Sequence, residues 1–296
     1  MILELRNIDK SFGEKEVLKG VSFKAQGGKA FGLLGRNGAG KTTSIRILMN
    51  VFPANSGEVL IDGEAINYDK IGIGYLPEER GLYPKKIIID QLTYFAELKG
   101  MNAKDAVKSI DYWLSRLGMT EYRNKRLDTL SKGNQQKIQL ITALAHDPDI
   151  VILDEPFSGL DPVNAMLLKD VVKEQITKGK IVLFSSHQMS YIEEFCDSIA
   201  IINAGKVAIS GDLYDIKRNY VRDKLVVSTT NPNAIKADLG DICIERDDQS
   251  LLIQLSDPDQ KQTMMKRIVE NYDIDEIKVF EPSLNDIFVE YAGEQI

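Results

Sequence analysis

The sequence predicts an α/β fold for roughly its first two thirds, followed by a smaller α+β domain. The segments Ile150–Leu153 and Lys180–Ser185 are continuously apolar at their centres, without the alternation of a half-exposed strand. Such runs are typical of strands that are buried on both faces of a parallel sheet. Because segments with helical spacing of apolar residues stand between them, helices and parallel strands alternate along the chain, which is the pattern of an α/β fold.

The first elements are strands. Residues 2–10 and 16–26 have strand character, and Gly13-Glu14-Lys15 is the expected turn between them. The apolar run Ala30–Leu34 leads into a glycine-rich loop. A helix follows that loop, with Ile45, Leu48 and Met49 on one face.

Helices are expected in the middle of this domain. Residues 85–118 form a helical stretch that we expect to be a separate subdomain. A further helix, with apolar residues at helical spacing from Ile138 to Ala145, precedes the strand at 150–153. A helix over 164–178 precedes the strand at 180–185 in the same way.

The pattern changes near Gly211. A connecting helix is expected at 213–222, and the elements after it are strand 224–229, helix 232–239, strands 242–247 and 250–256, helix 259–271, strand 274–281 and a closing helix Leu284–Tyr291. This βαββαβ order predicts a small α+β domain. We therefore divide the chain into residues 1–220, with a helical subdomain at about 85–147, and residues 221–296.

Composition narrows the classes of function. The 37 basic and 44 acidic residues give a net charge of −7, which argues against a general nucleic-acid coat. No run of about 18 apolar residues predicts a membrane span, and no charged-then-apolar leader follows Met1. Cys196 and Cys243 stand far apart without a CxxC pattern, so we expect two reduced thiols.

The segment Gly35-Arg36-Asn37-Gly38-Ala39-Gly40-Lys41-Thr42 fits the phosphate-loop pattern between a strand and a helix. Glycines allow backbone N–H groups to turn toward phosphate oxygens, and the helix N-terminus adds about half a positive charge. We expect Lys41 to reach the β- and γ-phosphates and Thr42 to bind Mg²⁺. A glycine-rich turn with an incidental lysine is the structural alternative.

A second motif, Asp154-Glu155, ends the apolar run at 150–153. A carboxylate at the end of a buried strand suits the Mg²⁺ shell, and we assign this role to Asp154. Glu155 is expected to orient or deprotonate the water that attacks the γ-phosphate, an effect of about 10²–10⁴-fold. Without the phosphate loop, an acidic pair that merely ends a strand would be the better interpretation.

Three further segments resemble those of the ABC (ATP-binding cassette) ATPase family, in order and spacing. Leu130-Ser131-Lys132-Gly133-Asn134-Gln135-Gln136 resembles the LSGGQ signature, Ser158-Gly159-Leu160-Asp161 resembles the D-loop, and Ser185-Ser186-His187 resembles the switch histidine. The resemblance covers about residues 1–220. It implies a P-loop NTPase cassette with a mostly parallel sheet core, an antiparallel β subdomain and a helical subdomain.

The resemblance also implies the ligands and the residues that bind them. ATP and Mg²⁺ are the implied ligands, with Glu155 and His187 catalytic and with Thr42, Asp154 and Glu78 at the metal. The residues expected to contact ATP are Phe12, Gly35, Asn37, Gly38, Ala39, Gly40, Lys41, Thr42, Thr43, Glu78, Ser131, Gly133 and Asp161. In the family ATP lies between the phosphate loop of one subunit and the signature of another, so ATP closes a dimer and hydrolysis opens it.

Four positions depart from the family pattern or allow two interpretations. Glu78 stands where the family has a glutamine, so it adds negative charge beside the γ-phosphate, and Arg80 is a candidate to offset that charge. The signature departs from its usual form at Lys132 and Asn134, although the Ser131 and Gly133 contacts are kept. Phe12 either stacks on adenine or is a core aromatic beside its apolar neighbours.

The segments Leu76–Pro84 and Glu281–Phe288 resemble a subgroup of bacterial exporters whose membrane subunit is a separate polypeptide. The expected protein is an ATP-hydrolysing subunit attached peripherally to the cytoplasmic face of the membrane. The expected partners are a membrane-spanning permease and a second ATPase chain, identical or similar, with no nucleic acid. Membrane coupling is expected near residues 76–100, through Leu82, Tyr83 and Pro84. The alternative is a soluble ABC-type ATPase acting as a non-transport motor or regulator.

Overall fold

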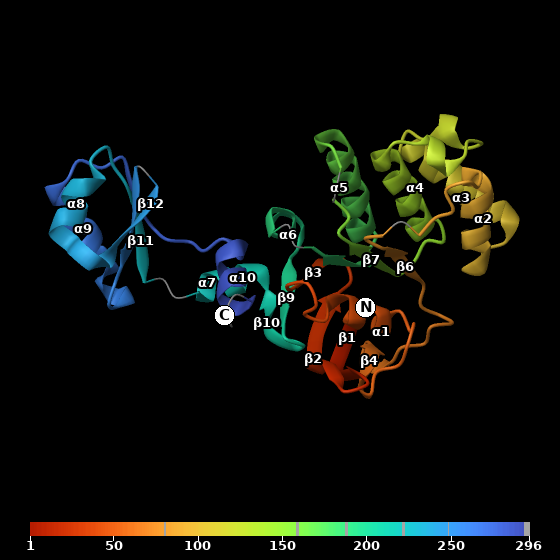
Figure 1. Cartoon of the computed structure of the whole chain (residues 1–296), viewed down its shortest axis with the longest axis horizontal. Coiled ribbons are helices and arrows are strands. Elements are labelled where there is room, and N and C mark those ends of the chain that lie inside the picture. The colour runs from red at the N-terminus through yellow and green to blue at the C-terminus, as the bar shows by residue number, and fades with distance from the viewer. Residues whose placement is uncertain (80, 158–159, 187–188, 221–222, 248, 293–296) are drawn as a thin grey trace. The chain divides into compact units, whose positions relative to one another are not determined.

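The computed structural model describes residues 1–79, 81–157, 160–186, 189–220, 223–247 and 249–292 (Figure 1). The chain divides into two compact units. The first comprises Met1–Leu213 together with the residues from Phe288 on, and the second comprises Tyr214–Ile287. Each unit has its own sheet structure and its own hydrophobic core.

The first unit begins with an antiparallel sheet of strand order β2-β1-β4-β5. Its strands are β1 (Ile2–Phe12), β2 (Lys15–Gln26), β4 (Ser56–Ile61) and β5 (Glu64–Ala65). β1 pairs with both β2 and β4, with Leu3 opposite Ala25 on one side and Ile61 on the other. Along much of β1 and β2, buried apolar residues alternate with more exposed residues. This is the pattern of a sheet with one face on the core.

A second sheet, with strand order β10-β9-β3-β8-β7-β6, carries the parallel strands (Figure 1). These are β3 (Ala30–Leu34), β6 (Ile73–Leu76), β7 (Ile150–Asp154), β8 (Ile181–Ser185) and β9 (Ser198–Asn203), with β10 (Lys206–Asp212) antiparallel at the edge. Every residue of β3, β7 and β8 is buried. Both faces of these strands are therefore covered, as their continuous apolar runs predict.

The two faces of this sheet carry different helices. Ile150 and Ile152 of β7 share one core cluster with Ile45 and Leu48 of α1 (Lys41–Leu48) and with the apolar face of β1 and β2. Because side chains alternate along a strand, Leu153 points to the other face. Figure 1 shows α4 (Lys132–Leu144) and α5 (Pro162–Thr177) on that other side of β6 and β7.

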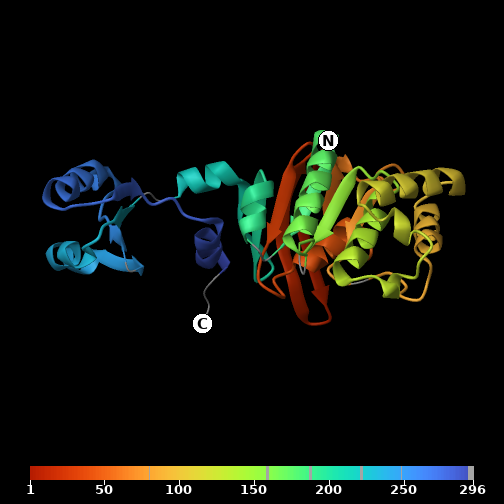
Figure 2. The same cartoon turned by 90° about the horizontal axis from the view of Figure 1, so that it is seen from above.

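The remaining helices of this unit are α2 (Ile88–Leu98), α3 (Ala103–Arg116) and α6 (Met189–Phe195). α2 and α3 pack against each other and against α4 to form the helical subdomain (Figures 1 and 2). Asn102 caps α3 by accepting a hydrogen bond from the Asp105 N–H at 3.0 Å. In the described part of the chain, no helix is both long and apolar enough to cross a bilayer.

The second unit contains an antiparallel sheet of strand order β12-β13-β11-β14. Its elements are β11 (Lys224–Ser228), α8 (Pro232–Leu239), β12 (Cys243–Asp247), β13 (Ser250–Gln254), α9 (Lys261–Asn271) and β14 (Glu276–Val279). Ile235 of α8 and Ile268 of α9 join Leu225, Val227 and Ile253 in one core, so both helices cover the same face of the sheet. The helices α7 (Leu213–Asn219) and α10 (Leu284–Ala292) stand where the chain passes between the units.

The predicted α/β and α+β classes are confirmed, and the βαββαβ order of the second part is found as predicted. Boundaries differ by a few residues; for example, β1 extends to Phe12 and α5 begins at Pro162. The elements β4, β5, β6, α6, β9 and β10 were not predicted from the sequence. β5 and β6 are short and β10 has no buried residue, so their apolar runs are weak, whereas the buried apolar run of β9 was missed.

Candidate functional site

The loop between β3 and α1 is shaped by glycines at positive φ. Gly38 has φ 80° and Gly40, which caps α1, has φ 118°. A Cβ on Gly40 would lie 2.5 Å from Cδ2 of Leu18, a fully buried side chain. The loop is held from behind, because the Gly205 N–H donates to the Ala39 carbonyl at 3.1 Å and the Ser44 hydroxyl donates to the Gly40 carbonyl at 3.0 Å. This geometry fits a phosphate loop.

Lys41 begins α1 and its ammonium turns back over the loop. Its Nζ donates to the carbonyl oxygens of Gly35 at 2.7 Å and Arg36 at 3.3 Å. Burial lowers the pKa of Lys41, and the charges of Glu155, Asp154 and Glu78 act against that shift. The charges of all three predicted carboxylates therefore act on the predicted phosphate lysine.

The other residues of the loop differ in exposure. Asn37, Gly38 and Thr42 are exposed, Thr43 is half-buried, and Gly35, Ala39 and Gly40 are buried. The N-terminus of α1 is therefore open to a ligand at Thr42, while the glycines behind it carry the backbone close to the core. An anion at this place would meet both the lysine and the positive end of the helix dipole.

Asp154 lies at the carboxyl end of β7, opposite Ser185 of β8 in register, and its side chain is 6% exposed. The Tyr75 hydroxyl donates to its Oδ2 at 3.3 Å. Burial raises the pKa of Asp154, whereas the hydroxyls of Ser185 and Tyr75 lower it. Burial also raises the pKa of Tyr75, so this phenol stays protonated as a donor near neutral pH.

Glu155 directly follows the strand with φ 49°, a left-handed conformation that is unfavourable for a side chain of this kind. Its N–H donates to the Ser185 carbonyl at 2.8 Å, and the Ser186 hydroxyl donates to its Oε2 at 3.0 Å. The carboxylate is 7% exposed. Strain of this kind clusters at functional sites, where surrounding contacts hold it in place.

Glu78 is exposed in the loop after β6. The carbonyls on both sides of it, those of Pro77 and Glu79, accept hydrogen bonds from the Gln139 amide nitrogen at 3.2 and 3.0 Å. Among the described residues, no three His, Cys, Asp or Glu side chains gather into a metal site of their own. The donor set of Thr42, Asp154 and Glu78 nevertheless fits Mg²⁺, which in proteins is usually bound by one or two carboxylates plus phosphate oxygens and water.

The signature segment forms the N-terminus of α4. Ser131 is the exposed cap, with its hydroxyl accepting from the Asn134 N–H at 3.4 Å. Gly133 packs closely against α5, since a Cβ there would lie 3.3 Å from Nδ2 of Asn164. α4 and α1 cover opposite faces of the parallel sheet. The helix that follows the phosphate loop and the helix that begins in the signature therefore lie on different sides of this sheet.

Asp161 caps α5, accepting from the Asn164 N–H at 3.0 Å and from the Asn164 side-chain amide at 2.5 Å. The Asp161 carboxylate thus caps the start of α5, and the residue is exposed to solvent. Four residues of the sequence analysis, Arg80, Ser158, Gly159 and His187, lie outside the residues that the structure describes.

Phe12 ends β1 and its side chain is 50% exposed. Its ring meets Phe52 edge-on at 5.5 Å between centroids, and the Lys10 ammonium lies 5.2 Å from its centroid. The interpretation of Phe12 as a core aromatic is therefore wrong. An exposed ring beside a cation is suited to stacking against a flat, electron-rich ligand.

Several residues around the site were not assigned a role from the sequence. Tyr75 holds the Asp154 carboxylate and Ser186 holds that of Glu155. Gln136 binds the backbone next to Glu155, and Gln139 binds the backbone on both sides of Glu78. Ser186 stands in the switch-histidine segment without a role of its own, and Tyr75 directly precedes the Leu76–Pro84 segment. The two glutamines lie on α4. The spacing of apolar residues predicts this helix but does not indicate which of its polar residues has a functional role.

Comparison with known proteins agrees with the motifs. The family model for ABC transporter matches residues 18–158, and the model for the C-terminal domain of DrrA1-3-like ATP-binding proteins matches residues 211–292. The chain is 40% identical to an uncharacterised ABC transporter ATP-binding protein of Bacillus subtilis over 99% of both chains.

More distant similarity extends to a named exporter and to solved structures. A Nod factor export ATP-binding protein of Burkholderia lata is 28% identical over 89% of each chain. A solved ATP-binding subunit of an ABC transporter superposes with a TM-score of 0.68 and 28% identity, over 74% of this chain and 93% of the other.

Proposed function

The chain belongs to the ATP-binding subunits of ABC transporters, and on this premise we propose that it hydrolyses ATP to drive export through a separate membrane subunit. Binding of ATP is the property of the family. Hydrolysis, the role of each residue and the coupling to export are our proposals for this chain. We further propose that residues 1–220 carry the ATPase and that residues 221–296 form an accessory domain.

The observation that carries the proposal is the meeting of one lysine and three carboxylates around the phosphate loop. The charges of Glu155, Asp154 and Glu78 act on the Lys41 ammonium. Lys41 begins α1, whereas none of the three carboxylates lies in that helix. A half-buried cation beside the two buried carboxylates Asp154 and Glu155 is costly unless a ligand uses the charges. Triphosphate with a divalent cation would satisfy both signs at once.

In the proposed mechanism, Lys41 and the α1 N-terminus neutralise the β- and γ-phosphates. Thr42, Asp154 and Glu78 would hold Mg²⁺, which stabilises charge on the phosphate oxygens. Tyr75 fixes the Asp154 carboxylate by its hydrogen bond. Glu155, held by Ser186, accepts a hydrogen bond or a proton from the attacking water. His187 is the proposed partner of the γ-phosphate, and Phe12 the proposed adenine contact.

We propose that two chains act as a dimer. Ser131 is exposed at the start of α4 and Gly133 is half-buried, on the sheet face opposite α1. This placement favours contact with a nucleotide bound by a second chain, identical or similar, over contact with the chain's own phosphate loop. ATP would then form part of the dimer interface, and its hydrolysis would release the two halves.

The proposed contact with the permease is an aromatic patch on the helical subdomain, formed by Tyr83, Tyr94 and Phe95. Tyr83 and Tyr94 are 55% and 52% exposed, and both rings lie within 6.2 Å of the Phe95 ring between centroids. The expectation that Leu82 contributes to this surface is wrong, because Leu82 is 9% exposed and packs inward. Exposed apolar patches of this kind mark interaction sites.

Export is supported by the subgroup resemblance and by similarity to the Nod factor export protein. We place the chain at the cytoplasmic face of the membrane, attached through its permease, and propose no nucleic-acid partner in view of its net charge of −7.

The deciding experiment compares the native chain with Glu155→Gln. We expect the variant to bind ATP and to form an ATP-dependent dimer by size-exclusion chromatography, while MgATP hydrolysis falls by about 10²–10⁴-fold. Glu174→Gln, a change in a partly exposed salt bridge of α5, is the matched control. Unchanged hydrolysis in Glu155→Gln would remove Glu155 from the proposed role, and a native chain without MgATP hydrolysis would overturn the proposed function.

A further inference from the structure

Two glutamines on α4 bind backbone carbonyls outside the helical subdomain. The side-chain amide of Gln136 donates to the Pro156 carbonyl at 2.5 Å. Gln139, one helical turn later, donates to the carbonyls of Pro77 and Glu79 at 3.2 and 3.0 Å. Residues three apart lie on the same helix face, so both amides leave α4 in one direction. Because a carbonyl only accepts, each amide must present its nitrogen.

These carbonyls belong to the two loops that carry the site's carboxylates. Pro156 directly follows Glu155, and Pro77 and Glu79 flank Glu78. The hydrogen bonds therefore attach α4 to the backbone beside two of the three carboxylates whose charges act on Lys41. Ser131 and Gly133 lie at the start of the same helix, and they are the residues proposed to contact a nucleotide bound by the other chain.

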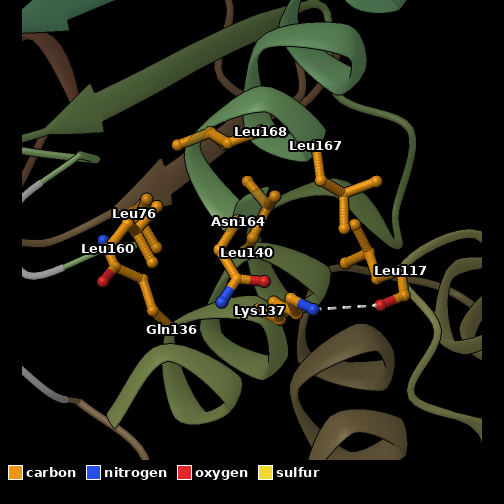
Figure 3. A pocket seen from close by; sticks show the side chains of 9 residues that line it. All are labelled: Leu76, Leu117, Gln136, Lys137, Leu140, Leu160, Asn164, Leu167 and Leu168. Carbon is orange, nitrogen blue, oxygen red and sulfur yellow. Dashed lines mark hydrogen bonds between the residues drawn. The ribbon is translucent and has the colours of Figure 1, made fainter. Parts of the chain in front are cut away.

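Packing around Gln136 leaves little room for α4 to move alone. Gly133 lies against Asn164 of α5, and a cavity of only about 20 Å³ remains between α4 and α5. This volume holds about one water molecule. Figure 3 shows Gln136 and Leu160 at one end of the cavity and Lys137 toward the other, with its ammonium bonded to the Leu117 carbonyl at 3.5 Å. A displacement of α4 must pass into its neighbours, since close-packed interiors transmit strain.

We propose that Gln136 and Gln139 are positioning residues that couple the two ATP sites of the dimer. When a γ-phosphate engages Ser131 and Gly133 of one chain, α4 of that chain shifts, and the two amides carry the shift to Pro156 and to the 77–79 loop. Glu155 and Glu78 of that chain then take up their working positions around its own nucleotide. This inference rests on the proposed function, in which each signature contacts the other chain's ATP. Hydrolysis is consequently cooperative.

The test replaces each amide by a side chain of similar length without a donor, in Gln136→Met and Gln139→Met. The matched control is Gln91→Met, because Gln91 is as buried as Gln139, at 4% against 6% exposed, and its amide donates to the Lys86 carbonyl inside the helical subdomain. Three quantities are measured: the Hill coefficient and kcat of MgATP hydrolysis, the Kd of ATP under dilute monomeric conditions, and the melting temperature.

We expect the native chain and Gln91→Met to hydrolyse MgATP with a Hill coefficient above 1, up to the limit of about 2 set by two sites. In Gln136→Met and Gln139→Met the Hill coefficient falls to about 1 and kcat falls at least about fivefold, while the monomer Kd stays within about twofold. A purely structural role would instead lower the melting temperature and leave the Hill coefficient unchanged.

The outcomes separate this inference from the proposed function. If both variants keep the native Hill coefficient, or if the native chain hydrolyses ATP without cooperativity, the coupling role is refuted and the ATPase assignment stands. A native chain that neither dimerises with ATP nor hydrolyses it refutes the proposed function itself. Should Gln136→Met fail to fold, Gln139→Met decides, because it breaks the second attachment without touching Pro156.

Discussion

The hydroxyl of Ser186 donates a hydrogen bond to the carboxylate of Glu155 over 3.0 Å, in a region where both side chains are buried. Glu155 also has a left-handed backbone, with its N–H bound to the Ser185 carbonyl. Two consecutive residues at the end of β8 thus fix both the backbone and the side chain of the proposed catalytic glutamate. This arrangement pre-orients the carboxylate before any substrate is bound.

Ser186→Ala is expected to lower MgATP hydrolysis by about 10- to 100-fold, because a hydrogen bond to a charged group contributes about 1.5–3 kcal/mol. ATP affinity should change by less than about twofold, since the hydroxyl acts on Glu155 and not on the phosphates. Steady-state kinetics and equilibrium binding measure the two effects. Ser210→Ala, which removes a hydroxyl bound to the Ile199 carbonyl, is the control. Native kinetics in Ser186→Ala would show that Glu155 is held by its backbone alone.

Glu78→Gln is expected to tighten ATP binding without Mg²⁺ by about two- to fivefold, because one negative charge near the phosphates is removed. The Mg²⁺ concentration that gives half-maximal hydrolysis should rise, since a carboxylate ligand is lost. Titration calorimetry and Mg²⁺-dependent kinetics measure both. Glu79→Gln is the neighbouring control, and equal behaviour of the two variants would contradict the placement of Glu78 at the metal.

Gly40→Ala should lower the free energy of unfolding more than Gly38→Ala does. Both positions have positive φ, which costs about 1–2 kcal/mol for a residue with a Cβ. At Gly40 the added Cβ also meets the fully buried Leu18 at 2.5 Å, whereas at Gly38 it meets open space. Overpacking adds about 1–3 kcal/mol. Urea unfolding with and without ATP tests this order, and equal stability losses would contradict it.

Stability is expected to fall on mild acidification because of His146. Burial lowers the pKa of His146 to about 4, even though its Nε2 lies 3.2 Å from the Ile73 carbonyl. The unfolded chain therefore binds a proton below about pH 6.5 while the folded chain stays neutral, so stability is full above that pH and is lost as pH falls toward 4. Between pH 7 and 5 the loss from this group is about 2 kcal/mol.

The measurement is the free energy of unfolding in urea at pH 7 and pH 5, for the native chain and for His146→Gln. The variant should be less stable at pH 7 yet lose about 2 kcal/mol less than the native chain over the same pH interval. Parallel pH profiles for the two proteins would show that His146 titrates normally in the fold.

Charge on the aromatic patch should separate the chain from its permease. Tyr83→Lys or Tyr94→Lys places a cation on an exposed ring position, so co-purification with the membrane subunit should be lost while ATPase activity of the free chain stays within about twofold. Tyr112→Lys is the control, because Tyr112 is similarly exposed on α3 of the same subdomain. Retained co-purification in the patch variants would contradict this docking surface.

The residues nearest the chemistry could be predicted because their types and positions are fixed by local patterns. The phosphate loop needs its glycines and Lys41, Asp154 ends a strand of five buried residues, and Glu155 directly follows that strand. The alternation of helices with β3, β7 and β8 was visible for the same reason. The second unit could be predicted equally well, because its strands and helices follow one another in the βαββαβ order over 224–279.

The roles of the other site residues depend on contacts between residues that are far apart in the sequence. Tyr75 reaches Asp154 across 79 positions, and Gln139 reaches Pro77 across 62. Nothing in the local pattern of either residue marks it, since a tyrosine in a strand and a glutamine on a helix have ordinary structural uses. The edge strand β10 has no buried residue and β5 has only two residues, so neither contains a buried apolar run. Leu82 was misplaced because apolar character in a loop does not say which side faces the protein.

The path of the chain has a consequence for how this protein is assembled from parts. The first unit resumes at Phe288, and the Asn203 side chain donates to the Tyr291 carbonyl at 3.1 Å. The second unit is consequently an insertion and not an appendage. A gene truncated after residue 213 would delete the last segment of the first unit together with the second unit, whereas excision of 214–287 as one block would spare that segment. Recombination that gains or loses this domain cleanly must therefore use two breakpoints.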